Sequence, residues 1–287
     1  MKKALIAAVL AILVFAAAVR LGGMEEIEST SEAYTVVVQP QYAWVTPFFD
    51  GFAGAARASW LGIIEHVGVV DVYGNWHARL PSGGPRLPVT DTTEEAELMA
   101  VIVDGRVGFF DSGWNEVISP RFEINDVRNF SEGMAAVRSG DMWGYIDETG
   151  NEVISPRFEI AQDFYEGLAG VFVDGEWSFI DRTGMEVLRL NYNYAGVWPF
   201  FDGMSMVWTG TQIGYINRYG AVVIPIVYDS GNSFSGGFAA VMRGGKWGFI
   251  DTEGREVVPF RFELVMDVYE RVAAVRYNGR WGFIRIN

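Results

Sequence analysis

Histidines and regularly spaced carboxylates are the residues of this 287-residue sequence that could do chemistry. The histidines are His66 and His77, and cysteine is absent, which excludes disulfides and thiolate chemistry. No Gly-x-Ser-x-Gly elbow accompanies the histidines, so a Ser-His-Asp triad is not indicated. Two histidines without cysteine do not form a usual zinc ligand set either. We interpret both histidines as ordinary surface residues.

The carboxylates recur in one register along the chain. Their positions are Asp147, Asp181 and Asp251, then Glu152, Glu186 and Glu256, and Glu123, Glu159 and Glu263. A glycosidase needs two carboxylates at a defined separation across one cleft, and calcium needs several converging oxygen ligands. One acid per repeat, at a turn or strand end, is instead explained by hydrogen bonds to turn amides. We expect no catalytic, cofactor-binding or metal-binding residue, and no cofactor.

A repeat organises these residues. A tripeptide with glycine between two large side chains recurs with first residues at 67, 107, 143, 177, 213, 247 and 281, so successive steps are 40, 36, 34, 36, 34 and 34 residues. A glycine lies ten residues before the first residue in four copies, and Phe or Tyr lies fifteen residues after it in five. Such constant spacing is typical of tandem repeat folds.

The clearest copy is Lys246-Trp247-Gly248-Phe249-Ile250-Asp251 followed by Glu253-Gly254-Arg255-Glu256-Val257-Val258-Pro259. This pattern resembles the WG-repeat (KWG-type) proteins of bacteria, from about Gln39 to the C-terminus. The resemblance implies a repeat scaffold that is often exported, generally not enzymatic and mostly without an assigned ligand. The copies depart from the pattern at Val67, Val107, Ile213 and Ser178.

The sequence of each unit predicts three short strands. Met134 to Arg138 is an example of the first, and pairs such as Asp174-Gly175 predict a tight hairpin to the second. The second strand carries Trp-Gly-aromatic-Ile, where the glycine indicates close approach of a neighbouring element. Asp-x-x-Gly then predicts a type I turn, and a third strand such as Glu256 to Val258 ends at proline.

The predicted fold class is all-β: a tandem array of about seven three-stranded β-meander repeats of 34–40 residues, either a propeller-like closed ring or an open superhelical array. Stacked neighbours are needed because one unit cannot bury both of its faces. Pairing of Tyr34 to Gln39 with Trp281 to Ile286 would complete the last unit and favour closure. The first unit carries about six extra residues between Ala53 and Val67, and residues 81–93 read as an exposed loop.

The aromatic residues are the remaining candidates for ligand binding. Trp143, Trp177, Trp247 and Trp281 lie in the repeat register. Because Val or Ile replaces them in three units, we interpret them as structural core, with sugar stacking as the alternative. The tryptophans outside the register are better candidates for exposed contacts: Trp44, Trp60, Trp76, Trp114, Trp198 and Trp208.

The N-terminus predicts export. Lys2 and Lys3 precede an apolar run from Ala4 to Val19, and Ala16-Ala17-Ala18 offers a cleavage site after Ala18. The alternative is an uncleaved membrane anchor. We divide the chain into residues 1–20 as signal peptide or anchor, 21–33 as linker and 34–287 as the repeat domain. The protein is then secreted or held on the outer face of the cytoplasmic membrane, and contacts membrane only through this segment if uncleaved.

The net charge and the composition limit the classes of function that the sequence allows. The net charge of -14 argues against nucleic acid, since phosphate neutralisation needs clustered Lys and Arg. The leading hypothesis is a non-enzymatic exported scaffold that binds a protein or surface ligand. The alternatives are a cell-envelope carbohydrate-binding module and, less favoured, a glycan-active enzyme.

Overall fold

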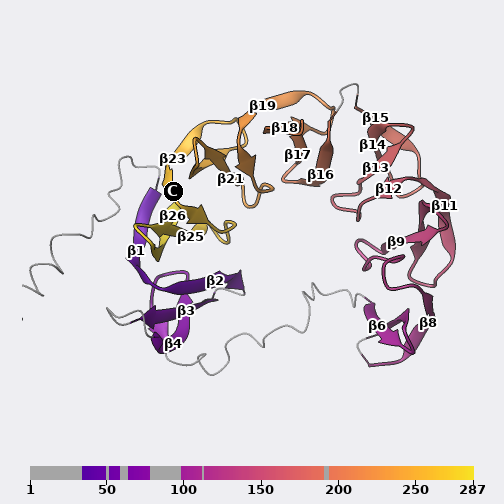
Figure 1. Cartoon of the computed structure of the whole chain (residues 1–287), viewed down its shortest axis with the longest axis horizontal. Coiled ribbons are helices and arrows are strands. Elements are labelled where there is room, and N and C mark those ends of the chain that lie inside the picture. Colours follow the sequence, from indigo (N-terminus) through magenta and orange to yellow (C-terminus); the bar gives the residue numbers. More distant parts are fainter. Residues whose placement is uncertain (1–33, 50–51, 59–63, 78–97, 112, 191–193) are drawn as a thin grey trace, which may run out of the picture. The chain divides into compact units, whose positions relative to one another are not determined.

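The computed structural model describes residues 34–49, 52–58, 64–77, 98–111, 113–190 and 194–287 (Figure 1). All regular structure in these ranges is β, in seven antiparallel sheets of three or four strands, which confirms the predicted all-β repeat fold. Within the same ranges there is no helix long and apolar enough to cross a membrane. The predicted signal or anchor segment, the linker and the loop at 81–93 lie outside the described residues.

The described residues form two compact units. Among the described residues, the first comprises those from 34 to 77 together with 261–266 and 270–287, and the second comprises those from 98 to 260 with 267–269. In the first unit, one sheet has the order β1 (Tyr34–Tyr42), β26 (Arg280–Ile286), β25 (Val272–Tyr277), β24 (Leu264–Val265). The other sheet is β2 (Trp44–Phe49), β3 (Phe52–Ala58), β4 (Ile64–Asp71) and β5 (Trp76–His77).

Five further sheets follow one another along the chain. Two have three strands: β6 (Met99–Val103), β7 (Arg106–Phe110), β8 (Glu116–Phe122), and β9 (Met134–Ser139), β10 (Met142–Asp147), β11 (Glu152–Phe158). The third is β12 (Ile160–Ala161), β13 (Ala169–Val173), β14 (Glu176–Ile180), β15 (Glu186–Arg189). The fourth is β16 (Gly196–Phe201), β17 (Met204–Trp208), β18 (Ile213–Asn217), β19 (Val222–Tyr228). The fifth is β20 (Ser230–Gly231), β21 (Phe238–Arg243), β22 (Lys246–Asp251), β23 (Glu256–Phe262).

The three predicted strands of the unit are present, and five of the seven sheets add a fourth strand before them. In three sheets this extra strand has only two residues, as in β12 and β20. Two residues carry no periodic pattern, because alternation of polar and apolar side chains needs a longer run. The added strand is therefore a structural finding that the repeat pattern did not indicate.

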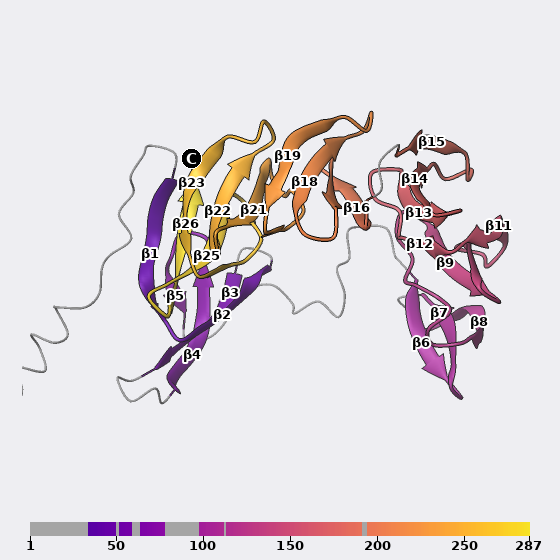
Figure 2. The same ribbon diagram turned by 45° about the horizontal axis from the view of Figure 1, so that its top comes forward.

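The N-terminal strand β1 completes the last sheet. It pairs antiparallel with β26, with Tyr34 opposite Ile286 and Tyr42 opposite Trp281, and Figures 1 and 2 both show the two strands side by side. Val37-Val38-Gln39-Pro40 of β1 matches Val153-Ile154-Ser155-Pro156 of β11 in type and place. The pairing expected from the sequence is confirmed, and β1 acts as the third strand of the last repeat.

The glycine of the second strand is required by a bulge in the third. Trp143 lies opposite Phe158 and Tyr145 opposite Ile154, so residues 155–157 of β11 all face Gly144. The bulged backbone comes close to the glycine: a Cβ on Gly248 would lie 2.6 Å from the carbonyl oxygen of Val258, and one on Gly108 would lie 2.7 Å from that of Ile118. The close approach predicted from this glycine comes from the same unit's own third strand.

Ser178 replaces the glycine of the second strand in one repeat, and there the third strand is not bulged opposite it. Its third strand has no proline, and Ser178 pairs regularly with Arg189 and Phe179 with Leu188. Without the bulge there is room for a side chain, and the buried Ser178 hydroxyl donates to Glu186 Oε2 at 2.8 Å. Glycine and bulge therefore occur together, and serine occurs where the bulge is absent.

We predict that Gly248→Ala destabilises the protein by about 2–3 kcal/mol, because the added methyl group must displace the backbone of β23. The matched control is Ser178→Ala, at the same strand position, which loses one hydrogen bond and about 1 kcal/mol. Urea unfolding of both variants measures the two free energies. Equal losses in the two variants would contradict the steric explanation.

Neighbouring sheets meet through one aromatic pair. In five repeats, the aromatic residue two places after the start of the Trp-Gly motif contacts a phenylalanine of the next repeat, at centroid distances of 4.7–5.1 Å. After Phe249 the phenylalanine position is Val268. The pairs are Phe109–Phe130, Tyr145–Phe164, Phe179–Phe200, Tyr215–Phe234 and Phe283–Phe48. The last pair joins the sheet of β26 to that of β2, so these two sheets use the same contact as sheets that follow one another in the chain.

Candidate functional site

The repeated aspartates cap turns. Asp147 Oδ1 accepts hydrogen bonds from the amides of Thr149 at 2.9 Å and Asn151 at 3.0 Å, as the Asp-x-x-Gly pattern predicts. Asp181 and Asp251 do the same in their own turns. The Thr149 hydroxyl and these amides hold the pKa of Asp147 below its ordinary value, because they stabilise the ionised carboxylate. These acids are occupied by local structure.

Asp111 caps its turn in the same way as Asp147 and Asp181. We predict that replacing these three aspartates makes the free energy of unfolding depend less on pH under acidic conditions. A carboxylate with a lowered pKa stabilises the folded state fully above its unfolded pKa of about 3.9, and this contribution is lost as the pH falls through the folded pKa. Asp111, Asp147 and Asp181 all have lowered pKa values. The triple Asp→Asn variant keeps the acceptor oxygens, as Asn217 does in its turn.

Urea unfolding between pH 2 and 7 measures the effect. The wild type should lose stability below about pH 4, and the triple variant should lose less over the same interval. Asp141→Asn combined with Glu256→Gln removes exposed charges outside these turns and serves as the control. A triple variant whose slope equals that of the wild type would contradict the assignment.

The repeated glutamates also have local partners. Glu152 Oε1 accepts from the Ser155 hydroxyl at 2.6 Å, Glu159 Oε1 from the Asp174 amide at 3.0 Å, and Glu263 from the Gly279 amide at 3.1 Å. The remaining positions vary: Glu186 accepts from Ser178, Glu123 pairs with Arg106 at 2.6 Å, and Glu256 is exposed at the start of β23. No group of three or more His, Asp or Glu side chains in the described residues could hold a metal ion.

Of the two histidines, only His77 has a described side chain. Its Nε2 lies 3.2 Å from Asp71 Oδ2, and Asp71 itself caps the turn before β5 through the amides of Tyr73 and Asn75. His77 is half-buried. The side chain of His66 lies outside the described residues.

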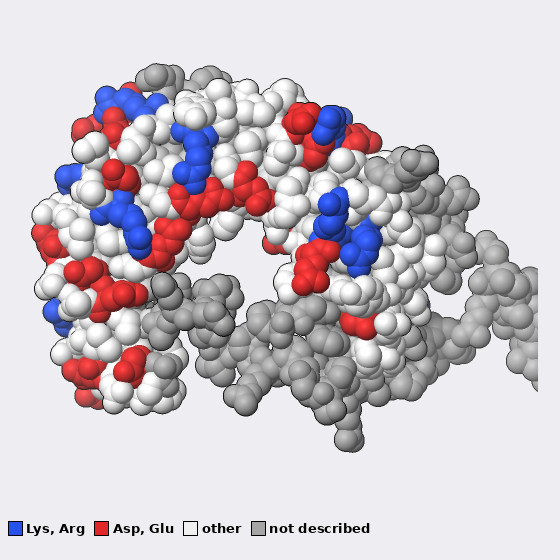
Figure 3. All heavy atoms as spheres, turned by 180° about the vertical axis from the view of Figure 1, so that it is seen from behind, with Lys and Arg blue, Asp and Glu red and all other residues white. Residues whose placement is uncertain are grey.

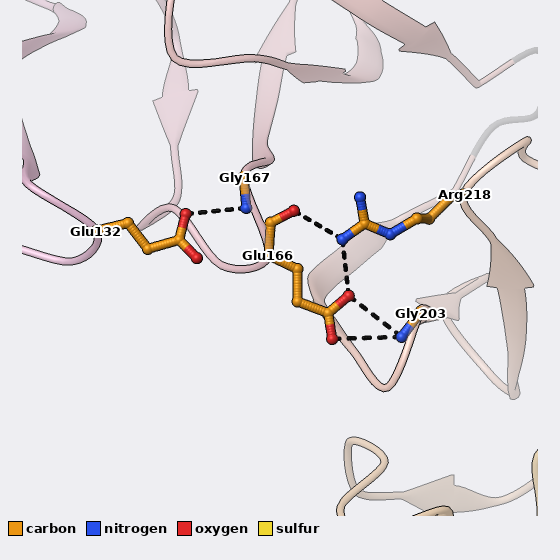
Figure 4. A network of polar contacts seen from close by, with 5 residues as sticks. All are labelled: Glu132, Glu166, Gly167, Gly203 and Arg218. Carbon is orange, nitrogen blue, oxygen red and sulfur yellow. Dashed lines mark hydrogen bonds and ion pairs between the residues drawn. The ribbon is translucent and has the colours of Figure 1, made fainter. Parts of the chain in front are cut away.

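A second series of carboxylates was not singled out in the sequence. Glu132, Glu166 and Asp202 each come just before the glycine of a two-residue hairpin and accept a hydrogen bond from the corresponding glycine of the next repeat. The donors are the amides of Gly167 at 2.9 Å and Gly203 at 3.2 Å, which Figure 4 shows, and the amide of Gly237 at 2.8 Å. We call these three acids the turn-acid ladder. The signal for it is an acid eleven residues before the tripeptide start.

The turn-acid ladder links repeats 34–36 residues apart and fixes carboxylates along one edge. Arg218 Nη2 reinforces it, lying 2.8 Å from Glu166 Oε2 and 2.7 Å from the Glu166 carbonyl oxygen (Figure 4). In the space-filling view, acidic side chains form a band with basic side chains beside it (Figure 3). The ladder stops at the next repeat, where Gly236 stands in place of the acid.

The tryptophans in the repeat register are not equally buried. Trp177 is buried, whereas Trp143, Trp247 and Trp281 are half-buried. Trp143 lies under the guanidinium groups of Arg128 and Arg138. The aromatic residue two places later is the core residue of each unit and is at most 1 % exposed: Phe109, Tyr145, Phe179, Tyr215, Phe249 and Phe283.

Among the tryptophans outside the register, three are exposed: Trp114 by 68 %, Trp198 by 37 % and Trp208 by 39 %. Trp76 stacks on Tyr42 at 5.7 Å. The side chains of Trp44 and Trp60 lie outside the described residues. Trp198 and Trp208 are therefore two exposed tryptophans on neighbouring strands of one sheet, β16 and β17.

A pocket of about 640 Å³ lies in the second unit beside Trp198. Its walls come from β16, β17 and the segment 231–236, and they include both apolar and hydrogen-bonding side chains. We call it the Trp198 pocket, and its lining includes Glu166, Trp198, Phe201, Asp202, Asn232 and Asp267. Two of these carboxylates, Glu166 and Asp202, belong to the turn-acid ladder.

Backbone irregularity positions Trp198. The pairing of β16 with β17 shifts between Val197 and Phe200, so Trp198 and Pro199 form a bulge. The hydroxyl of Ser205 donates to the Trp198 carbonyl oxygen at 2.6 Å, and Ser205 is fully buried. Five other repeats have alanine at the position of Ser205: Ala53, Ala135, Ala169, Ala239 and Ala273.

The repeated sheets and their inter-sheet contacts define a tandem β-repeat scaffold, in which each unit buries its faces against its neighbours. The chain belongs to the family of WG-containing repeat proteins, which matches residues 35–55, 108–143, 143–177, 177–207, 213–247 and 247–281. The family resemblance seen in the sequence is thereby confirmed. Among curated protein sequences, none matches this chain.

Solved structures with similar chain paths are distant in sequence. Hsv2p of Kluyveromyces lactis is 12 % identical over 92 % of this chain and 97 % of its own, with a TM-score of 0.45. The AfRom2 CNH domain is 9 % identical over 88 % of this chain and 99 % of its own, with a TM-score of 0.39. The computationally designed Ika4 protein is 11 % identical over 43 % of this chain and 88 % of its own, with a TM-score of 0.32.

Proposed function

We propose that this protein is a non-enzymatic, exported repeat scaffold that binds a ligand of the cell surface at the Trp198 pocket. The observation that carries the proposal is that an exposed tryptophan forms a pocket wall in the one repeat where Trp198 and Trp208 break the pattern. A pocket with an apolar wall and a few convergent polar groups is the usual form of a ligand site.

The hydrogen bonds of the pocket carboxylates support binding without chemistry. Glu166 accepts from Gly203 and pairs with Arg218, Asp202 accepts from Gly237, and Asp267 accepts from Asn232. An acid–base pair for glycoside cleavage needs one carboxylate held as the acid and another as base or nucleophile. Carboxylates engaged by amide and guanidinium donors suit recognition better than proton transfer.

Binding can be tested by sedimenting the purified full-length chain with isolated bacterial cell envelopes. We predict that Trp198→Ala reduces the bound fraction at least tenfold, because it removes the apolar wall of the pocket. Trp114→Gly is the matched control: it removes another exposed tryptophan and installs the residue found at this turn position in Gly150 and Gly184. Equal sedimentation of the wild type and Trp198→Ala would refute the proposed site.

Export rests on the N-terminal sequence alone. We predict that a C-terminally tagged full-length chain is exposed to added protease in spheroplasts of a bacterial host, or is released into the medium. Leu10→Arg combined with Leu13→Arg interrupts the apolar run and should keep the tag protected inside the cell. A tag protected in both chains would overturn the proposed location.

A further inference from the structure

Trp198 and Trp208 belong to the repeat of β16 to β19. They occupy positions at which other repeats have different side chains. The residues equivalent to Trp198 are Arg128, Gln162, Asn232 and Met266, and those equivalent to Trp208 are Arg138, Phe172, Met242 and Arg276. The same repeat has Ile213 where Trp143 and Trp247 start the motif elsewhere. This repeat therefore lacks an aromatic side chain at the start of the motif and has tryptophan at two other positions. Folding of the repeat does not require tryptophan at those two positions.

Both rings lie against one small residue. A Cβ placed on Gly196 would lie 3.6 Å from Trp198 Cζ3 and 3.8 Å from Trp208 Cε3, so the two rings share the surface above this glycine. Gly196 pairs directly with Trp208 across β16 and β17. With more than a third of each side chain exposed, the rings form an apolar platform that leads from the Trp198 pocket to solvent.

The lining of the pocket also includes polar side chains whose positions hydrogen bonds fix. Asn232 Nδ2 donates to Asp267 Oδ1 at 2.5 Å, and the Gly237 amide donates to Asp202 Oδ2 at 2.8 Å. These bonds fix the side chains and leave Asn232 Oδ1, Asp202 Oδ1 and Asp267 Oδ2 as acceptors that the bonds do not use. The lining of the pocket therefore combines an aromatic side chain with fixed hydrogen-bond acceptors.

We infer that the ligand of this pocket is a neutral saccharide of two or more sugar units, an inference that rests on the function proposed above. A pyranose ring has a face of C–H groups that can lie on an indole and a rim of hydroxyls that donate to carboxylate and amide oxygens. Trp198 contacts the sugar in the pocket, and Trp208 contacts the adjoining unit.

Other ligand classes fit the same surface less well. A wholly apolar ligand would remove Asp202 and Asp267 from water without replacing their hydrogen bonds, which is costly. A uronic or sulfated glycan would bring negative charge against Glu166, Asp202 and Asp267. Neutral sugars satisfy both kinds of side chain in the lining of the pocket.

The experiment is an array of neutral, uronic and sulfated oligosaccharides probed with the tagged full-length chain. Its strongest neutral binder is then titrated while intrinsic tryptophan fluorescence is recorded. The expected result is binding of neutral oligosaccharides, with affinity at least tenfold lower in Trp198→Ala and severalfold lower in Trp208→Ala. Trp114→Gly should bind as the wild type does, and raising the salt concentration should change the affinity little.

Two results overturn the inference: no neutral saccharide bound by the folded wild type, or equal affinity of Trp198→Ala and the wild type. Loss of envelope binding after protease treatment of the envelopes, without saccharide binding, would identify a protein ligand and reject the saccharide. In that case a Trp198-dependent interaction with envelopes would still support the scaffold, so the two proposals fail separately.

Discussion

The contact between the second strand of one sheet and the phenylalanine of the next is the interaction on which the fold depends. A sheet of three or four short strands cannot bury both faces by itself, so each must cover its neighbour. Edge-to-face rings contribute about 0.5–1.5 kcal/mol beyond the area they bury. Tyr145 and Tyr215 add a hydrogen bond to the next repeat, donating to the carbonyl oxygens of Gln162 and Asn232 at 2.7 Å.

The backbone elements could be predicted from the sequence more fully than the side-chain contacts. The three strands shared by every unit, the hairpins, the aspartate turns and the pairing of β1 with β26 follow from residues whose geometry is restrictive, such as the Asp-x-x-Gly turns. The two-residue strands carry no pattern. The turn-acid ladder has a sequence signal in the spacing of its acids, but the partner of Glu132 is an amide of another repeat, and local sequence does not specify such a long-range contact. Among the tryptophans outside the repeat register, Trp198 is distinguished because it lines a pocket.

Under the proposed function, the repeat also separates folding from recognition. Residues that recur along the chain serve turns, bulges and inter-sheet contacts, and Ser178 replaces the glycine of the second strand where the bulge opposite it is absent. Recognition is then free to use positions where repeats differ. Residues 198–208 show this division: Phe200 keeps the inter-sheet contact, while Trp198 and Trp208 are open to solvent.

The shared sheet of β1 and β26 affects the order of events during biosynthesis. Strand β1 emerges from the ribosome long before its partner, since the other six sheets are encoded between the two strands. Until β26 arrives, β1 presents unpaired amides and carbonyls, which is the kind of edge that recruits other chains. Proline at position 40 weakens this edge because it cannot donate a hydrogen bond. Transport across a membrane before folding would bring both strands together in the same compartment.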